Sequence, residues 1–108
     1  MTGTEGQAST QFRMTQEEWA EVQRIGKQLV QASIKDERER QDEKWGEQNH
    51  DDDYWFIIES EELGEVAKAI LGEGPDSVRR EIVQVVAVGI AWLEAIERRK
   101  NLAVRPIS

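Results

Sequence analysis

The segment that most constrains the fold is an apolar stretch close to the C-terminal end of the chain. Large apolar side chains there cover every side of a helix: Ile82, Val83, Val85, Val86, Val88, Ile90, Trp92, Leu93 and Ile96. Such a helix has no face suited to water, so we expect it to lie at the centre of the fold. The β-branched residues would also suit a strand, but the length of the segment favours a helix. The longest apolar run, residues 82–93, is shorter than the roughly 20 residues of a membrane span, and Gln84 interrupts it.

Local signals predict two helices upstream of this stretch. Thr15 and Glu18 have the spacing of a capping box, which starts the first helix, and Gly46 ends it. The aspartates at 51–53 offer N-caps for a second helix over about 54–71. A turn rich in glycine then leads into the third helix.

The chain of 108 residues corresponds to one domain. We expect a flexible tail over residues 1–13, a helical domain over 14–100 whose last helix covers about 76–100, and a C-terminal tail over 101–108. The predicted fold class is all-α, an antiparallel helical bundle. Three helices form a thin bundle around a helix that is apolar all round. A homodimer or a dimer of dimers would complete it.

The composition excludes several functional classes. Acidic residues outnumber basic ones by 22 to 14, for a net charge of −8, which argues against nucleic acid or an anionic membrane as partner. The absence of cysteine excludes disulfides and zinc–thiolate sites. With one histidine, carboxylates are the plentiful metal ligands, and they suit Mg²⁺ or Mn²⁺. No signal peptide is visible in residues 1–13, so a cytoplasmic location is expected.

Residues 35–44 are almost wholly charged. Opposite charges three and four positions apart are typical of a solvated helix face. The alternative is that Arg38, Gln41 or Lys44 faces a ligand cleft.

Pairs of acidic or amide side chains recur in the second and third predicted helices. Glu62 and Glu65 lie one helical turn apart, and so do Glu81 and Gln84. Carboxylates on a buried helix face cost free energy unless a cation meets them, so two facing pairs suggest a divalent metal between the helices. The alternative is that they are surface glutamates, with Glu81 paired to a nearby arginine.

These motifs match the signature of a known family. They read Glu61-Glu62-Leu63-Gly64-Glu65, then fifteen residues, then Glu81-Ile82-Val83-Gln84. The pattern resembles that of the MazG-like all-α nucleoside triphosphate pyrophosphohydrolases, whose signature is E-E-x-x-E, a variable gap and E-x-x-D. The resemblance covers about residues 35–100. The segments 44–50 and 83–88 look like a branch that is common in phage and bacterial genomes.

The resemblance implies a Mg²⁺ site, with Mn²⁺ as an alternative cation. Side chains of both motifs would hold the cation against the triphosphate: Glu62, Glu65, Glu81 and, through its amide oxygen, Gln84. Glu61 would be a further ligand or would orient the attacking water. Gln84 departs from the signature aspartate, because an amide carries no charge and cannot act as a base. Glu59 or one of the aspartates at 51–53 would then compensate.

The implied reaction is hydrolysis of a nucleoside triphosphate to the monophosphate and pyrophosphate. The resemblance suggests a deoxynucleotide as substrate, and a purine deoxynucleotide in phage-related members. Around the loop before the acidic helix, Trp45, Asn49, His50 and Trp55 would bind the base, and Lys68 would meet the phosphates. For the tryptophans the alternative is core packing, for His50 a place in the loop, and for Lys68 a surface charge. A dUTP-type or phosphoribosyl-ATP-type reaction is the alternative within the superfamily. A nucleotide-binding or structural module without activity is the alternative outside catalysis, and Gln84 is its chief support.

Overall fold

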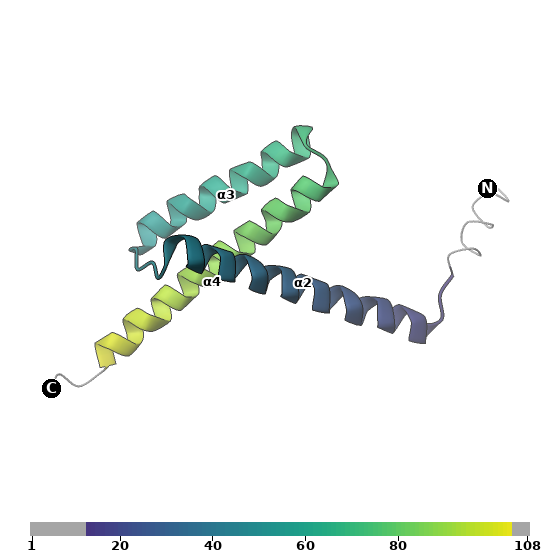
Figure 1. Ribbon diagram of the computed structural model, residues 1–108, viewed down its shortest axis with the longest axis horizontal. Helices are drawn as coiled ribbons and strands as arrows, with labels where there is room; N and C mark the ends of the chain where they lie inside the picture. Colours follow the sequence, from purple (N-terminus) through teal and green to yellow (C-terminus); the bar gives the residue numbers. More distant parts are fainter. Residues whose placement is uncertain (1–12, 105–108) are drawn as a thin grey trace. The chain divides into compact units, whose positions relative to one another are not determined.

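The computed structural model describes residues 13–104, and within them the chain is all-α (Figure 1). It contains the helices α2 (Gln16–Trp45), α3 (Asp52–Gly72) and α4 (Pro75–Val104) and, in this range, no strand. Most of the two predicted tails lies outside the described residues. Helix α4 continues past its predicted end at residue 100, into the segment that we expected to be a tail.

Helix α2 begins where the capping-box pattern predicts. The Glu18 N–H donates to the Thr15 hydroxyl oxygen at 3.0 Å, and the Thr15 N–H donates to the Glu18 carboxylate at 2.9 Å. Farther along, charged side chains pair one turn apart, as Lys35 and Glu39 do at 2.6 Å, which suits a solvated helix surface. The helix ends directly before Gly46, whose φ of 69° is a left-handed conformation that costs glycine no strain.

The chain divides into two compact units, Met1–Gln31 and Ala32–Ser108. In the first unit the described residues form the N-terminal part of α2. Apolar side chains three positions apart form a stripe on this part of the helix, and they are exposed: Trp19, Val22 and Ile25. No element of this unit covers them in the part that the structure describes.

The second unit is built on a hairpin of α3 and α4, which pack along one another (Figure 1). Asp51 caps α3, because its carboxylate accepts a hydrogen bond from the Tyr54 N–H at 3.0 Å. The turn contains Gly74 with a φ of 95°, and Pro75 takes the first position of α4, where its missing N–H costs no hydrogen bond. The shortness of this turn makes the two helices antiparallel.

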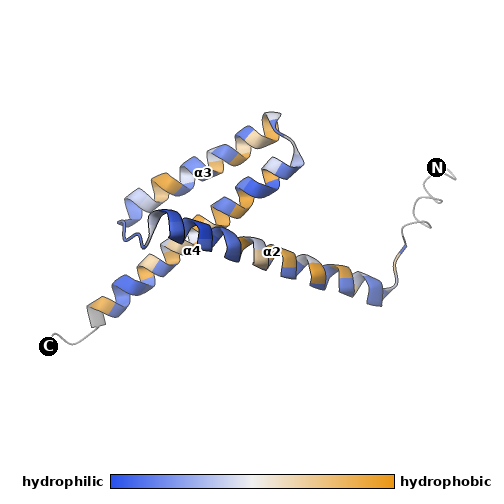
Figure 2. Cartoon of the chain, viewed as in Figure 1, coloured by the Kyte–Doolittle hydropathy of each residue, from blue (hydrophilic) through white to orange (hydrophobic). Residues whose placement is uncertain are grey.

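The core of the second unit is small and lies around one tryptophan. Trp55 is 1% exposed and packs against Val88, Ala91 and Ala95, with Ile58 and Trp92 partly buried beside them. The alanines let α3 and α4 approach closely. In the single chain α4 is covered only in part, since Ile82 and Leu93 are 46% and 63% exposed, and this agrees with the thin bundle that the sequence predicts. Figure 2 shows apolar residues along both helices of the hairpin and a hydrophilic segment in the C-terminal half of α2.

Long polar side chains connect the C-terminal part of α2 to α4. Arg38 Nη2 lies 2.6 Å from Glu94 Oε1, and Arg79 Nη2 donates to the Ser33 hydroxyl at 3.1 Å. The charged stretch is therefore not wholly solvated, because one of its faces meets the hairpin. None of the helices in residues 13–104 has the length and apolar character to cross a membrane.

Candidate functional site

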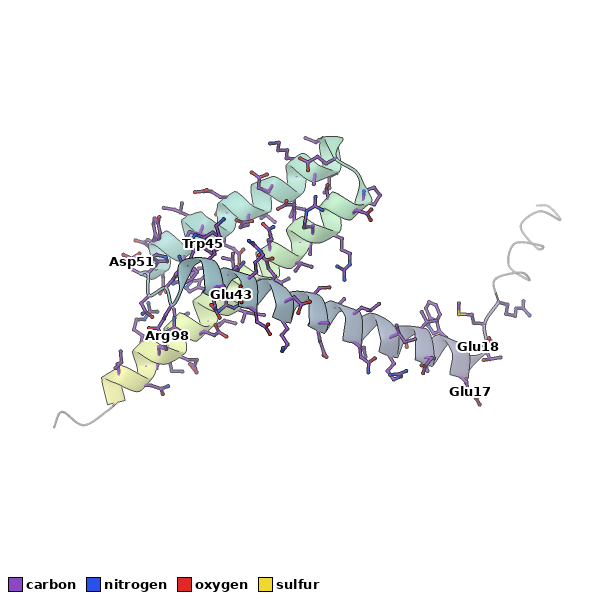
Figure 3. All side chains as sticks on the ribbon, in the orientation of Figure 1. Glu17, Glu18, Glu43, Trp45, Asp51 and Arg98 are labelled. Carbon is purple, nitrogen blue, oxygen red and sulfur yellow. The ribbon has the colours of Figure 1, made fainter. Side chains whose placement is uncertain are left out.

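A cavity of about 210 Å³ opens among α2, α3 and α4 within the second unit. We call it the acidic pocket, and its lining residues are Glu37, Arg40, Gln41, Trp45, Gln48, Trp55, Ile58, Glu62, Gln84 and Val88. It brings together Trp45, Trp55, Glu62 and Gln84, which the sequence predicted as site residues. Figure 3 marks Trp45 at the end of α2.

Glu62 lies at the electrostatic centre of the acidic pocket. Burial raises its pKa, and the negative charges of Glu81, Glu65, Glu37 and Glu61 raise it further, in that order. Its Oε2 atom is buried and has no hydrogen-bond partner among the described residues. A carboxylate in this setting is stabilised by a proton or by a cation. The structure thus brings the carboxylates of both predicted motifs within electrostatic reach of one another.

Glu59 extends the same acidic face one helical turn toward the start of α3. Burial raises its pKa first and the charge of Glu62 second, and its Oε1 atom has no hydrogen-bond partner in the described part of the chain. A Cβ at Gly89 of α4 would lie 3.1 Å from Glu59 Oε2. The glycine therefore leaves room for this carboxylate at the interface of the two helices.

The donors in this pocket fit Mg²⁺ chemically, because they are carboxylate and amide oxygens. Glu62 and Glu81 are half-buried, whereas Glu61 and Glu65 are exposed. Over residues 13–104 no three side chains of histidine, cysteine, aspartate or glutamate are grouped as a ligand set. The Mg²⁺ site stays a prediction, and these side chains would have to turn toward a common point to form it.

Gln84 and the aspartates at 51–53 have different surroundings. Gln84 is half-buried and lines the acidic pocket together with Glu62. Asp51 caps α3, and Asp52 accepts hydrogen bonds from Trp92 Nε1 at 2.9 Å and from Arg99 Nη2 at 3.0 Å. These two aspartates hold the helix in place. Glu59 is the nearer candidate to compensate for the missing carboxylate.

Helix α2 contributes residues to the pocket that the acidic motifs do not contain. Glu37 faces Glu62, but Arg40 holds it with Nε at 2.9 Å and Nη2 at 2.5 Å, and this pairing lowers the pKa of Glu37. Gln41 is 7% exposed and lines the acidic pocket, so this side chain of the charged stretch turns inward, whereas its contact with a ligand stays a prediction. Lys44 is exposed and lies over the Trp45 ring at 4.8 Å.

A second cavity of about 200 Å³ adjoins the first. We call it the arginine pocket, and its lining residues are Arg38, Gln41, Asp42, Gly46, Glu47, Gln48, Trp55, Ala91, Glu94 and Arg98. Arg38 donates to Gln41 Oε1 at 3.0 Å, to Asp42 Oδ1 at 2.9 Å and to Glu94 Oε1 at 2.6 Å. Gln41, Gln48 and Trp55 line both pockets and form the wall between them.

The aromatic residues around the loop serve packing as well as the pockets. Trp55 is a core residue and also lines both cavities, so core packing is confirmed for this tryptophan and base binding stays a prediction. Trp45 is 51% exposed at the edge of the acidic pocket. His50 makes edge contacts with Tyr54 and Trp55, at 4.6 and 5.0 Å between ring centroids, and lines neither pocket. Its place matches the alternative of a histidine that orders the loop.

Besides His50, two more predicted substrate-binding residues lie outside both pockets. Asn49 donates from Nδ2 to Glu47 Oε2 at 2.7 Å and accepts at Oδ1 from Arg98 Nε at 2.9 Å, so both ends of its amide are engaged. Lys68 is exposed on α3. The structure therefore does not bring these two side chains together with Glu62.

Comparison of the chain with protein-family models, with curated proteins and with solved structures found no match.

Proposed function

We propose that this protein hydrolyses a (deoxy)nucleoside triphosphate to the monophosphate and pyrophosphate with the help of Mg²⁺. The observation that supports the proposal most is the surplus of negative charge around Glu62, in a pocket that Trp45 and Trp55 also line. Arg40 lines the same pocket, but it is hydrogen-bonded to Glu37 and meets Glu62 only through its charge. The negative charge that remains fits a divalent cation, and tryptophan rings fit a heterocyclic base. The resemblance of the two acidic motifs to the MazG-like signature points to the same chemistry.

The roles of the residues follow from their place. Glu62, Glu65 and Glu81 would hold the cation, and the amide oxygen of Gln84 would complete the set. Bound Mg²⁺ would neutralise the phosphate oxygens and lower the pKa of a water. Glu61, exposed next to Glu62, would orient the attacking water and take its proton. Attack at the α-phosphorus breaks its bond to the bridging oxygen, and pyrophosphate leaves.

Gln84 removes one negative charge from the signature, and neighbouring carboxylates offset it. Glu37 and Glu59 both lie within electrostatic reach of Glu62. Glu37 is paired with Arg40, whereas Glu59 has a carboxylate oxygen without a hydrogen-bond partner among the described residues. A cation with two positive charges would still meet an excess of negative charge here.

The direct test is to incubate the protein with each NTP and dNTP, with dUTP and with phosphoribosyl-ATP, in Mg²⁺ or Mn²⁺, and to separate the products by ion-exchange chromatography. We expect equal amounts of monophosphate and pyrophosphate from at least one substrate. Glu62→Gln should abolish turnover, whereas Glu43→Gln, at an exposed position of α2, should leave it unchanged. Formation of the diphosphate and orthophosphate instead would contradict attack at the α-phosphorus.

The second candidate is a nucleotide-binding module without catalytic activity. The amide of Gln84 in the place of a carboxylate favours it. Nucleotide binding that depends on Mg²⁺, without turnover of any substrate in the panel, would support this candidate. If neither metal nor nucleotide binds, only a structural role remains.

We also propose that the active form is a homodimer or a dimer of dimers. The apolar faces that one chain leaves exposed on α3 and α4 support this proposal. A second copy would cover the outer side of α4, which a single chain leaves open.

A further inference from the structure

The loop between α2 and α3 is held from one side by an arginine of α4. Arg98 donates from Nη2 to the backbone carbonyl oxygen of Gln48 at 3.0 Å and from Nε to Asn49 Oδ1 at 2.9 Å. Arg98 Nε also lies 3.7 Å from Glu47 Oε2. Three consecutive loop residues are thus tied to one guanidinium, whose planar fork fixes their direction. Figure 3 marks Arg98 on α4.

The amide side chains near the pockets differ in what they still have to offer a ligand. Asn49 is engaged at both ends of its amide, and Gln41 accepts from Arg38 and donates to Glu37 at 3.2 Å. The Gln48 side chain has no hydrogen-bond partner in residues 13–104, although the residue is half-buried. An amide in this position has a donor and an acceptor free for a ligand.

The position of Gln48 connects the two cavities. It lines the acidic pocket and the arginine pocket, next to the buried ring of Trp55. Gln84, in contrast, lines only the acidic pocket, as Glu62 does. A ligand that a cation holds at Glu62 would therefore occupy a pocket that Gln48 also lines.

We infer that Gln48 is the side chain that reads the nucleobase of the substrate, and that Arg98 is the positioning residue that holds Gln48 in place. The inference rests on the proposed function. A nucleobase edge carries neighbouring donors and acceptors, and a carboxamide matches such an edge with two hydrogen bonds. Asn49, which the sequence suggested for this role, instead belongs to the contact that fixes the loop.

The first experiment measures kcat and KM of Gln48→Ala for the four dNTPs with Mg²⁺. Two lost hydrogen bonds between neutral groups correspond to about a tenfold loss. We expect KM for the preferred dNTP to rise about tenfold, kcat to change less than about threefold, and the preference among the four bases to weaken. Gln28→Ala, at an exposed position of α2, is the matched control and should match wild type. Unchanged KM and unchanged base preference in Gln48→Ala would overturn the inference.

The second experiment tests the role of Arg98 through its coupling to Gln48. Arg98→Met should raise KM, as Gln48→Ala does, and should speed hydrogen exchange of the backbone amides at 47–50. Its helix content, measured by circular dichroism, should equal that of wild type. Arg98→Lys should restore part of the loss. Because both residues act through one contact, the double variant Gln48→Ala with Arg98→Met should be no worse than Gln48→Ala. If the increases in KM of the two single variants add up in the double variant, Arg98 acts independently of Gln48, and the positioning role is wrong.

Failure of the proposed function gives a different result from failure of this inference. If wild-type protein hydrolyses no substrate of the panel, the proposed hydrolytic function is wrong. Calorimetric titration of the four dNTPs in Mg²⁺ then decides the role of Gln48. Binding to wild type that weakens about tenfold in Gln48→Ala supports it. Equal binding, or no binding to wild type, overturns it.

Discussion

The Glu62 carboxylate lies where few interactions of the protein stabilise its negative charge. Its Oε2 atom is shielded from water and unpartnered within the described residues, and four other glutamates repel its charge. A group of this kind lowers the stability of the protein when it ionises, and such a cost is typical of functional sites. The sequence indicated Glu62 because its spacing from Glu65 is helical. It gave no sign of Glu37, which comes from another helix and meets Glu62 only through tertiary packing.

The raised pKa of Glu62 predicts how stability depends on pH without metal. A carboxyl whose pKa is higher in the folded state stabilises the fold below its unfolded pKa, about 4.3 for glutamate. That contribution is lost as pH rises through the folded pKa. Wild type should therefore lose stability from this group as pH rises above the unfolded pKa, whereas Glu62→Gln should not.

Thermal unfolding in EDTA checks this prediction. The Tm of Glu62→Gln should exceed that of wild type at pH 8, and the two should agree at about pH 4. Added Mg²⁺ should raise the Tm of wild type at pH 8 and leave that of Glu62→Gln nearly unchanged. The same difference in Tm at both pH values would mean that Glu62 is not desolvated as described. Glu43→Gln serves as the control for the loss of one charge.

Helices in this chain start and end at residues with local reasons to do so. The Thr15–Glu18 capping box, the Asp51 cap and the first-turn Pro75 depend only on neighbouring residues, so the sequence predicted the helix starts to within about two residues. The faces of α2 were harder to predict. In a stretch where nearly every residue is charged, no apolar stripe shows which side chain turns inward. Gln41 became buried because the hairpin packs on its side of the helix.

Replacement by alanine should change the stability of the protein in opposite directions at two glycines, one inside a helix and one at a helix end. A Cβ at Gly64, inside α3, would meet no atom within 4 Å, so Gly64→Ala should stabilise by about 0.5–1 kcal/mol through helix propensity. Gly46 has a φ of 69°, and Gly46→Ala should destabilise by roughly 1–2 kcal/mol. Urea unfolding of both variants measures the difference. Destabilisation by Gly64→Ala would indicate that a second chain packs closely at this position.

Among the described residues, more large apolar side chains are exposed than buried. Along α3, Phe56, Leu63 and Ile70 recur at intervals of seven and are 64%, 60% and 66% exposed. Residues seven apart share one helix face, so these side chains form one stripe. The sequence led us to expect a thin bundle that needs a partner, and the exposure of this stripe is consistent with that. The sequence could not show which face remains open, because that depends on where Trp55 anchors the hairpin.

The predicted homodimer can be tested on this stripe. Light scattering coupled to gel filtration should give at least twice the monomer mass for wild type. Leu63→Glu places a charge in the middle of the stripe and should shift the protein toward the monomer, with helix content retained. Ala20→Glu, on the exposed surface of α2 away from its apolar stripe, should leave the mass unchanged. A monomeric wild type, or a Leu63→Glu variant with the mass of wild type, would exclude this face as the dimer contact.

If the proposed cation binds at Glu62, the shared charge around this residue would couple its uptake to proton release. Because burial and four neighbouring glutamates favour the protonated form of this carboxyl, a cation that binds there expels part of a proton into the buffer. The apparent affinity for Mg²⁺ must then fall as the solution becomes more acidic. The measured binding heat must also change with the ionisation enthalpy of the buffer. Mg²⁺ and protons would thus compete for the glutamates around Glu62, and the fraction of protein with bound Mg²⁺ would depend on the pH of the solution.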